Sequence, residues 1–192
     1  MKKYYLILVL ILLAAGVSSC NNSSNNEKQE NKTEATSIDA SVLGVQLGLS
    51  KSAAIDSLDK GQVDFDATPG VSCEVTGPVP FADTVSFATA HLQFAKDVVT
   101  GISCESAYPE SAYPDKGKSA QAFYNQLNGI LTSKYKKFAA KENAGGATAA
   151  KYDDHKTLVT VTLNHVAATD SVEAYWLVKL DIAPSGNAAQ AE

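Results

Sequence analysis

The stretch that decides the fold is Val159-Thr160-Val161-Thr162-Leu163-Asn164, in which apolar and polar residues alternate. Residues 175–182 repeat the pattern, with apolar side chains at every second position: Trp176, Val178, Leu180 and Ile182. Successive side chains of a strand point to opposite faces, so a period of two gives each strand one apolar face. The two segments therefore predict a β-hairpin with one buried face.

Three more strands are expected upstream of this hairpin. Residues 71–76 alternate and end at Gly77-Pro78, a pair typical of a turn. Residues 84–94 form a longer strand whose apolar positions change parity near Ala88 and Thr89, and such a change indicates a β-bulge. A turn then leads into a strand over 97–105, the second arm of another hairpin.

Two helices are also expected. Ser50 suits the N-cap of a short helix that stops at Gly61. A long helix should run from about Ser119 to Phe138, because five apolar residues recur there at helical spacing: Phe123, Leu127, Ile130, Leu131 and Tyr135. Strands with one polar face suit an antiparallel sheet. We therefore predict an α+β fold, an antiparallel sheet with two helices packed on one face.

The N-terminus has the layout of a secretion signal. Lys2-Lys3 precedes an apolar run from Tyr4 to Val17, and its 14 residues are fewer than the ~20 that a transmembrane helix needs. With Ser18-Ser19-Cys20, the end of this run resembles the lipobox of bacterial lipoproteins. The resemblance implies that the signal peptide 1–19 is removed and that Cys20 carries a diacylglyceryl group and an acylated amine. The alternative is an ordinary signal peptide with a chance cysteine.

The rest of the chain is expected to have three parts. Residues 20–39 contain few apolar side chains and should form the lipidated cysteine and a disordered tether, roughly 25 Å in average span. A single domain should occupy 40–184, followed by a flexible tail over 185–192. Asn21 rather than aspartate follows the cysteine, and resemblance to enteric lipoproteins makes the outer membrane the favoured location. A periplasmic and a surface-facing domain both remain open.

The charge of the chain argues against nucleic acid as a partner. All 16 basic residues are lysine, against 21 acidic residues. Removal of Lys2 and Lys3 with the signal leaves 14 lysines and a formal charge of −7. An acidic chain without guanidinium groups lacks the usual means of gripping phosphates and base edges.

No arrangement of residues predicts catalysis. His91, His155 and His165 lack the spacing of paired metal ligands, and the Asp153-Asp154-His155 segment is expected to be a polar turn rather than a cation site. The sequence has no Gly-x-Ser-x-Gly elbow and no glycine-rich phosphate loop after a strand. We therefore expect a non-catalytic domain without a metal or cofactor.

The folded part opens with Gly44-Val45-Gln46-Leu47-Gly48-Leu49-Ser50-Lys51, which leads into a short helix and then strands. This opening resembles small envelope-lipoprotein domains of the β-lactamase-inhibitor-like class. The resemblance implies helices packed on a curved antiparallel sheet, and a role in binding proteins or supporting envelope assembly.

Two surfaces are candidates for binding. Tyr108 and Tyr113 lie in a repeat whose prolines are five residues apart, which predicts a rigid loop. Tyrosines on such a loop offer an amphipathic surface to a protein or carbohydrate, although the loop can also pack its own rings. The second candidate is the polar face of the last hairpin, which is either ordinary surface or a binding face formed together by Leu158, Thr160, Thr162, Tyr175 and Leu177.

These surfaces favour a protein-interaction domain whose partner is an envelope protein. The alternative is a carrier of a small molecule or glycan. A filled core with an exposed aromatic patch would favour the interaction domain, whereas a roomy apolar cavity between helices and sheet would favour the carrier.

Cys73 and Cys104 are candidates for a disulfide. With Cys20 committed to lipid, two cysteines remain in an oxidising compartment, which favours a bond between them. In a simple meander of the three upstream strands, however, two strand spacings of about 9.6 Å would separate the cysteines, beyond the ~7 Å limit between bonded Cα atoms. Free, buried thiols are the alternative.

The lipobox yields the first testable prediction. Replacing Cys20 with alanine should abolish metabolic palmitate labelling and leave an uncleaved or soluble product, because the thiol that accepts the lipid is lost. Palmitate labelling that persists in the variant would rule out the anchor.

Overall fold

The computed structural model describes residues 35–68, 71–82, 84–140 and 148–186. The expected signal peptide, Cys20 and most of the expected tether lie outside the described residues. In the part of the chain that is described, no helix is long and apolar enough to cross a membrane.

The described residues form two α-helices, a short 3₁₀-helix and eight strands. In chain order they are α1 (Lys51–Gly61), β1 (Asp64–Thr68), β2 (Ser72–Ala82), β3 (Val85–Ala95), β4 (Val98–Pro109), α2 (Lys118–Tyr135), η1 (Lys136–Phe138), β5 (Ala139–Ala140), β6 (Thr148–Asp153), β7 (Thr157–Val166) and β8 (Tyr175–Pro184).

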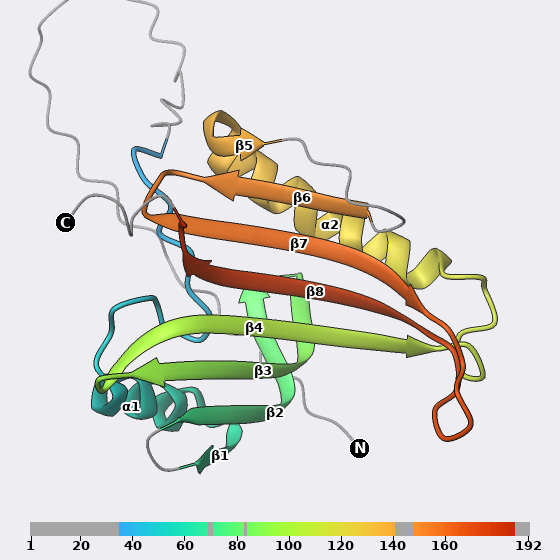
Figure 1. Cartoon of the computed structure of the whole chain (residues 1–192), viewed down its shortest axis with the longest axis horizontal. Coiled ribbons are helices and arrows are strands. Elements are labelled where there is room, and N and C mark those ends of the chain that lie inside the picture. Colours follow the sequence, from blue (N-terminus) through green and yellow to red (C-terminus); the bar gives the residue numbers. More distant parts are fainter. Residues whose placement is uncertain (1–34, 69–70, 83, 141–147, 187–192) are drawn as a thin grey trace, which may run out of the picture. The chain divides into compact units, whose positions relative to one another are not determined.

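The strands form one antiparallel sheet in the order β1-β2-β3-β4-β8-β7-β6-β5. Each half of the sheet is a four-stranded meander that follows its own helix, and the halves meet where β4 pairs with β8 (Figure 1). Leu58 of α1 and Leu127 of α2 belong to the same buried cluster as the inward residues of the strands. The predicted α+β fold, with both helices packed on one face of an antiparallel sheet, is therefore confirmed.

The core continues across the seam between the two halves. Ile102 of β4 lies opposite Ile182 of β8, Cys104 lies opposite Leu180, and all four are at most 2% exposed. Helix α2 covers this region with five buried side chains: Ala120, Tyr124, Leu127, Leu131 and Tyr135. Phe123 and Ile130, which the sequence also placed on this face, are only partly buried. Three of the five predicted residues, Leu127, Leu131 and Tyr135, are thus in the buried stripe of α2, and Ala120 and Tyr124 take the places expected for Phe123 and Ile130.

The sequence predicted five strands, and the three that it missed lie at or beside the edges of the sheet. Strands β1 and β5 are the two edges, and β5 has only two residues. Strand β6 buries only Tyr152. Such strands have a solvent-exposed edge or cover little of the core, so they carry no long apolar alternation to detect.

Three prolines lie inside strands where the sequence predicted a turn and a loop: Pro78 and Pro80 in β2 and Pro109 in β4. Strand β2 continues past Gly77-Pro78 to Ala82, with register shifts relative to β3. Strand β4 continues to Pro109, which lies opposite Tyr175 of β8, so Tyr108 is a strand residue and not part of a loop. Proline cannot donate a hydrogen bond to a neighbouring strand. The strands tolerate it because the β2–β3 ladder is interrupted at Pro78 and shifts register again after Pro80, and because β4 ends at Pro109.

The N-terminal segment joins the fold earlier than the expected domain limit of 40. Ile38 is 6% exposed, and its N–H donates to Oδ2 of Asp154 at 2.7 Å. The Asp39 carboxylate accepts a hydrogen bond from the Tyr135 hydroxyl at 2.6 Å and pairs with the Lys134 ammonium at 2.9 Å. These contacts fix the segment beside the C-terminal end of α2.

Ser185, which the sequence placed in the flexible tail, also belongs to the folded part. It is 3% exposed, its N–H donates to the Lys156 carbonyl at 2.9 Å, and its hydroxyl donates to Asp153 Oδ2 at 3.1 Å. Residues 187–192 of the expected tail lie outside the described residues.

Asp154, in the turn between β6 and β7, connects this turn to the N-terminal segment. Beside the bond from Ile38, its Oδ1 accepts from the N–H groups of Lys156 at 3.0 Å and Thr157 at 2.7 Å. Burial disfavours the charged carboxylate, but the three N–H donors outweigh it and lower the pKa of Asp154 below its ordinary value of 3.8.

Replacing Asp154 with alanine should therefore lower the free energy of unfolding by about 1–3 kcal/mol, because three N–H donors lose their acceptor. Hydrogen exchange should also speed up at Ile38. Folding lowers the pKa of Asp154. The contribution of Asp154 to the free energy of unfolding is therefore fully present above the pKa of the unfolded chain, and it is lost as the pH falls through the lowered pKa of the folded protein. The stability difference from the parent should thus persist at pH 7 and shrink below pH 3.8.

Asp153→Ala is the matched control, because Asp153 accepts from Ser185 and His155 and has no bond to Ile38. Exchange at Ile38 that speeds up equally in both variants would contradict the role assigned to Asp154.

Candidate functional site

The sheet splits between β3 and β4. The two strands pair from Ala95 opposite Val98 to Thr89 opposite Glu105, and no further. Beyond this point Ala88 falls in a register shift, residues 85–87 of β3 are paired with β2 alone, and residues 106–109 of β4 are paired with β8 alone. We call the opening between these two stretches the fork.

A bulge causes the fork. The register between β2 and β3 shifts between Thr76 and Val79, where Gly77 has a φ of 101°. On the opposite strand, β3, the alternation of buried and exposed side chains changes parity at Ala88 and Thr89. This change confirms the irregularity predicted there. Because a bulge bends a strand and increases its twist, the end of the β2–β3 hairpin runs across the direction of β4 instead of alongside it (Figure 1).

Helix α2 holds the bent hairpin in place. The Gln126 amide Nε2 donates to the carbonyl of Thr84 at 3.2 Å and to its hydroxyl at 2.8 Å. On the inner side, the Phe87 ring packs edge-on against Phe123 of α2, with centroids 5.3 Å apart. The hairpin therefore leans toward the helix, and the fork stays open without a third strand inside it.

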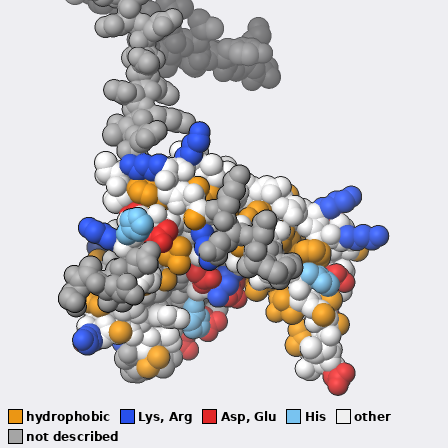
Figure 2. Space-filling view, turned by 45° about the horizontal axis from the view of Figure 1, so that its top comes forward, with side chains coloured by type: hydrophobic (Ala, Val, Ile, Leu, Met, Phe, Trp, Pro, Cys, Tyr) orange, Lys and Arg blue, Asp and Glu red, His pale blue; other side chains and the backbone are white. Residues whose placement is uncertain are grey.

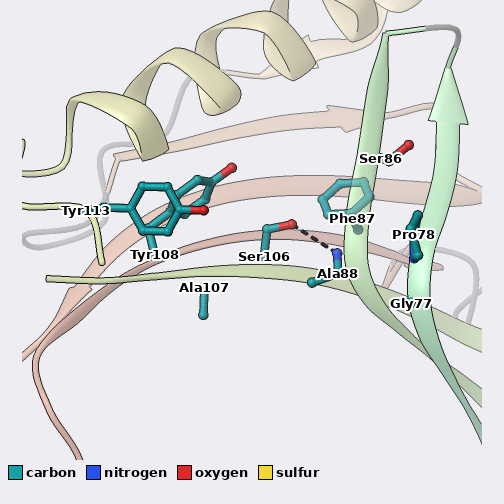
Figure 3. A pocket seen from close by; sticks show the side chains of 9 residues that line it. All are labelled: Gly77, Pro78, Ser86, Phe87, Ala88, Ser106, Ala107, Tyr108 and Tyr113. Atoms are coloured by element: carbon teal, nitrogen blue, oxygen red, sulfur yellow. Dashed lines mark hydrogen bonds between the residues drawn. The ribbon is translucent and has the colours of Figure 1, made fainter. Parts of the chain in front are cut away.

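One hydrogen bond crosses the fork. The Ala88 N–H donates to the Ser106 hydroxyl at 3.2 Å, the bond drawn as a dashed line in Figure 3. Ser106 is only 8% exposed, in a row of otherwise apolar buried residues. Its hydroxyl replaces the carbonyl that a neighbouring strand would have supplied to Ala88.

Two tyrosines line one side of the fork. Tyr108 extends from β4, Tyr113 comes from the following loop, and their rings meet edge to face with centroids 5.1 Å apart. Burial, with a smaller effect of neighbouring Tyr113, raises the pKa of Tyr108, so its hydroxyl is uncharged and can donate a hydrogen bond at neutral pH. Tyr113 is 41% exposed, so this aromatic surface is open to solvent.

A close glycine contact positions the start of α2 behind this loop. Gly117 has a φ of 81°, and a Cβ at this residue would lie 2.4 Å from the Trp176 ring. Only glycine fits both the backbone conformation and the space. The Tyr113 N–H donates to the Pro109 carbonyl at 2.8 Å, which fixes the other end of the loop against β4.

The fork contains a depression of about 440 Å³ that is open to solvent. Its lining comes from both branches and from the loop: Gly77, Pro78, Ser86, Phe87, Ala88, Ser106, Ala107, Tyr108 and Tyr113 (Figure 3). None of these side chains is a carboxylate, imidazole, amine or thiol. The depression therefore offers aromatic surface and hydroxyl groups, and no general base stronger than a tyrosine.

The second predicted surface does not form one patch. Leu158, Thr160 and Thr162 share the outer face of the sheet with Tyr175 and Leu177, as expected. However, Leu158 lies opposite Ala183, six residues along β8 from Leu177, a distance of about 20 Å. Between the two ends lie charged residues of β8, where the Lys179 ammonium is 3.2 Å from Asp181 and 3.6 Å from Glu105.

The histidines lie apart from the fork lining. His165 Nε2 is 3.0 Å from Glu110 Oε1, and the ring lies 4.8 Å from that of Trp176. His91 is on an outward position of β3, and His155 occupies the turn before β7. Over residues 35–186, leaving aside those not described, no group of three histidines, cysteines or acids is placed to hold a metal.

The meander predicted for the first half is present, and its geometry separates the two cysteines. Cys73 of β2 lies opposite Leu92, Cys104 of β4 lies opposite Ala90, and β3 runs between them. Both thiols are free and buried. Burial raises the pKa of Cys73 and raises that of Cys104 to about 12. Of the two alternatives drawn from the sequence, the structure has the free thiols.

Several lining residues could not be identified from the sequence. Tyr108 and Tyr113 were predicted to contribute to binding, and the structure places them together. Phe87 and Ser106 read as ordinary strand residues. The only local signals were Gly77-Pro78 and the change of parity at Ala88, which indicate a bend but do not show which strand the bend uncovers.

Comparison with known proteins assigns no relative to this arrangement: the chain matches no family model, no curated protein and no solved structure.

The buried thiols give a direct test of the strand order. The mature chain carrying Cys20→Ser should take up two alkyl groups per molecule when alkylated in denaturant without reductant, and almost none when folded, since thiolate is the reactive form. Mass spectrometry counts the groups. A two-dalton deficit with no alkylation in denaturant would mean a disulfide and would overturn the meander.

Proposed function

We propose that this protein is a lipid-anchored protein of the bacterial cell envelope whose domain binds another protein, without catalysis, at the fork between β3 and β4. The observation that carries this proposal is the fork itself, two strand stretches that each lack a neighbour on one side and that lie beside the partly buried Tyr108 and the exposed Tyr113.

Backbone groups in the fork favour an extended segment of a protein as ligand. Strand edges pair with extended chains, and the exposed main chain supplies hydrogen bonds while adjacent pockets select side chains. Residues 85–88 and 106–109 are such edges, and the depression between them is wide enough to receive a side chain of a partner.

The aromatic side of the fork supports the same conclusion. Tyr108 and Tyr113 have few rotatable bonds, so they lose little entropy on binding, and each presents both an apolar ring and a hydroxyl group. Their ring contacts with one another and with Phe123 hold them in place before a ligand arrives. Such a prepared surface reduces the cost of association.

The attachment to a membrane is proposed from the N-terminal sequence. The basic start, the apolar run and the Val17-Ser18-Ser19-Cys20 pattern support a lipid on Cys20 and a domain in the cell envelope, and Asn21 favours the outer membrane. The partner is accordingly expected to be another envelope protein.

A carrier of a glycan is the second candidate, because two tyrosine rings beside the hydroxyls of Ser86 and Ser106 also suit a sugar ring. The openness of the depression argues against a carrier, since small-ligand sites usually enclose most of the ligand surface.

Site-specific photocrosslinking distinguishes the fork from the outer face. Replacing Tyr113 with p-benzoylphenylalanine should give a protein adduct in intact cells, because the probe lies on the exposed side of the fork. The same replacement at Tyr175, on the outer face of β8, is the matched control. It should give roughly tenfold less adduct, because contacts with a partner concentrate on a few central residues of an interface and Tyr175 does not line the fork.

Adducts at Tyr175 and none at Tyr113 would move the binding site to the outer face. Absence of protein adducts from both positions, together with saturable retention of the protein on immobilised envelope glycans, would support the carrier instead.

A further inference from the structure

Five lysines gather at one end of the domain, where α2 ends. Their side chains define the lysine pole: Lys134, Lys136, Lys137, Lys151 and Lys156. The first three are at the end of α2 and in η1, which continues directly into β5. Ala140 of β5 lies opposite Lys151 of β6, and Lys156 follows in the turn after β6. Figure 2 shows lysine side chains at this end of the domain and others spread over the rest of the visible face.

The charge of the pole differs in sign from that of the rest of the domain. Its five lysines are accompanied by Asp39, Asp153 and Asp154, which leaves a formal charge of +2. The other described residues contain six lysines and twelve acids, a formal charge of −6. The domain therefore has one positive end on a negative body.

The acids of the pole are already bound within the domain, whereas several of its lysines face solvent. Asp39 is held by α2, and the two aspartates of the β6–β7 turn accept backbone or hydroxyl donors. Among the residues that the structure describes, no ion pair involves Lys136, Lys137 or Lys156, and all three are exposed.

The chain that leads to Cys20 enters the domain at this same pole. Asp39 pairs with Lys134, and Ile38 is bonded to the β6–β7 turn. Fifteen residues, 20–34, separate the proposed lipid from the first described residue, and such a length spans at most about 50 Å. A lipid on Cys20 would thus connect the domain to the bilayer through the pole, although a tether of this length does not fix the orientation by itself.

We propose that the lysine pole binds the surface of an anionic bilayer and thereby points the fork away from the membrane. The proposal rests on the lipid anchor proposed at Cys20, which supplies attachment, whereas the pole supplies orientation. Each lysine near an anionic surface raises the binding constant of the domain for that surface by roughly fivefold. This gain is weak alone, but it is sufficient to orient a domain that is already tethered. The negative body is repelled by the same surface, so the two ends act together.

The orientation has a direct consequence for binding. The pole lies at the C-terminal end of α2, whereas the rings of Tyr113 and Phe123 lie near its N-terminal end. Helix α2 has 18 residues and is therefore about 27 Å long. With the pole on the bilayer, the fork opens toward a partner some distance from the lipid surface.

The test uses the mature chain, residues 20–192, coupled through the Cys20 thiol to a maleimide lipid in vesicles. The thiols of Cys73 and Cys104 are buried, so coupling is selective for Cys20. One set of vesicles is phosphatidylcholine and the other contains phosphatidylglycerol, and neither lipid has an amine. Acetylation of each lysine by a water-soluble succinimidyl ester is then followed by mass spectrometry.

On the anionic vesicles, acetylation of Lys136, Lys137 and Lys156 should slow by about threefold or more relative to the neutral vesicles. Lys116 and Lys118, at the other end of α2, are internal controls and should react equally on both. The slowing should disappear at about 1 M salt, where the screening length falls to about 3 Å.

The double variant Lys136→Glu, Lys137→Glu should lose the slowing at Lys156, whereas the matched variant Lys116→Glu, Lys118→Glu should retain it. Equal rates on both vesicles, or slowing at Lys116 and Lys118 instead, would overturn the proposal. Because the coupling is chemical, these outcomes do not depend on acylation in the cell. Failure of the anchor proposal would be detected in a separate experiment, as palmitate labelling that does not require Cys20.

Discussion

The pairing of β4 with β8 is the constraint on which the rest of the structure depends. It joins the two meanders through eight residue pairs, from Ile102 opposite Ile182 to Pro109 opposite Tyr175. Even the nearest of these partners are 66 positions apart in the chain, so the seam forms only when a long loop has closed. Helix α2 contacts strands on both sides of the seam, β3 and β4 in one half and β7 and β8 in the other. Neither half would bury its inner face as well alone, because the core is continuous across the join.

The fork is a consequence of the same pairing. Strand β4 follows β8 to Pro109, whereas β3 leaves β4 at Thr89 to follow β2 toward α2. A strand with a neighbour on one side has unpaired backbone groups on its other edge. Outside the fork, such edges occur at the outer strands of the sheet, β1 and β5. The bulge at Gly77 and Pro78, the contact of Gln126 with Thr84 and the Ser106 hydroxyl together keep the opening stable without filling it. The proposed binding site is therefore built by rigid elements, which suits recognition of a partner with little rearrangement.

The two ends of α2 separate the two proposed roles of the domain. At the N-terminal end, aromatic rings line the fork. At the C-terminal end, lysines surround the point where Ile38 and Asp39 join the fold. The bonds from Asp154 and Asp39 make this end a fixed exit for the chain, so a tether attached there has a defined starting point. Charge and connectivity thus favour the same proposed orientation, with the fork directed away from the end at which the proposed tether joins the domain.

The sequence by itself determined the features that depend on neighbours along the chain. Alternation specified the strands around Val161 and Val178, the change of parity at Ala88 indicated the bulge, and helical spacing located α2. The two tyrosines of the fork could also be chosen, because proline-bounded aromatics stand out locally. Only the tertiary structure decided which strands are adjacent, since a period of two marks the buried face of a strand but not the strand beside it. Strand pairing explains why Pro109 lies in a central strand and why Ser106 bonds to Ala88. Contacts distant in the chain also bury Ile38 and Ser185. The edge strands bury few side chains, so they could be recognised only in the assembled sheet.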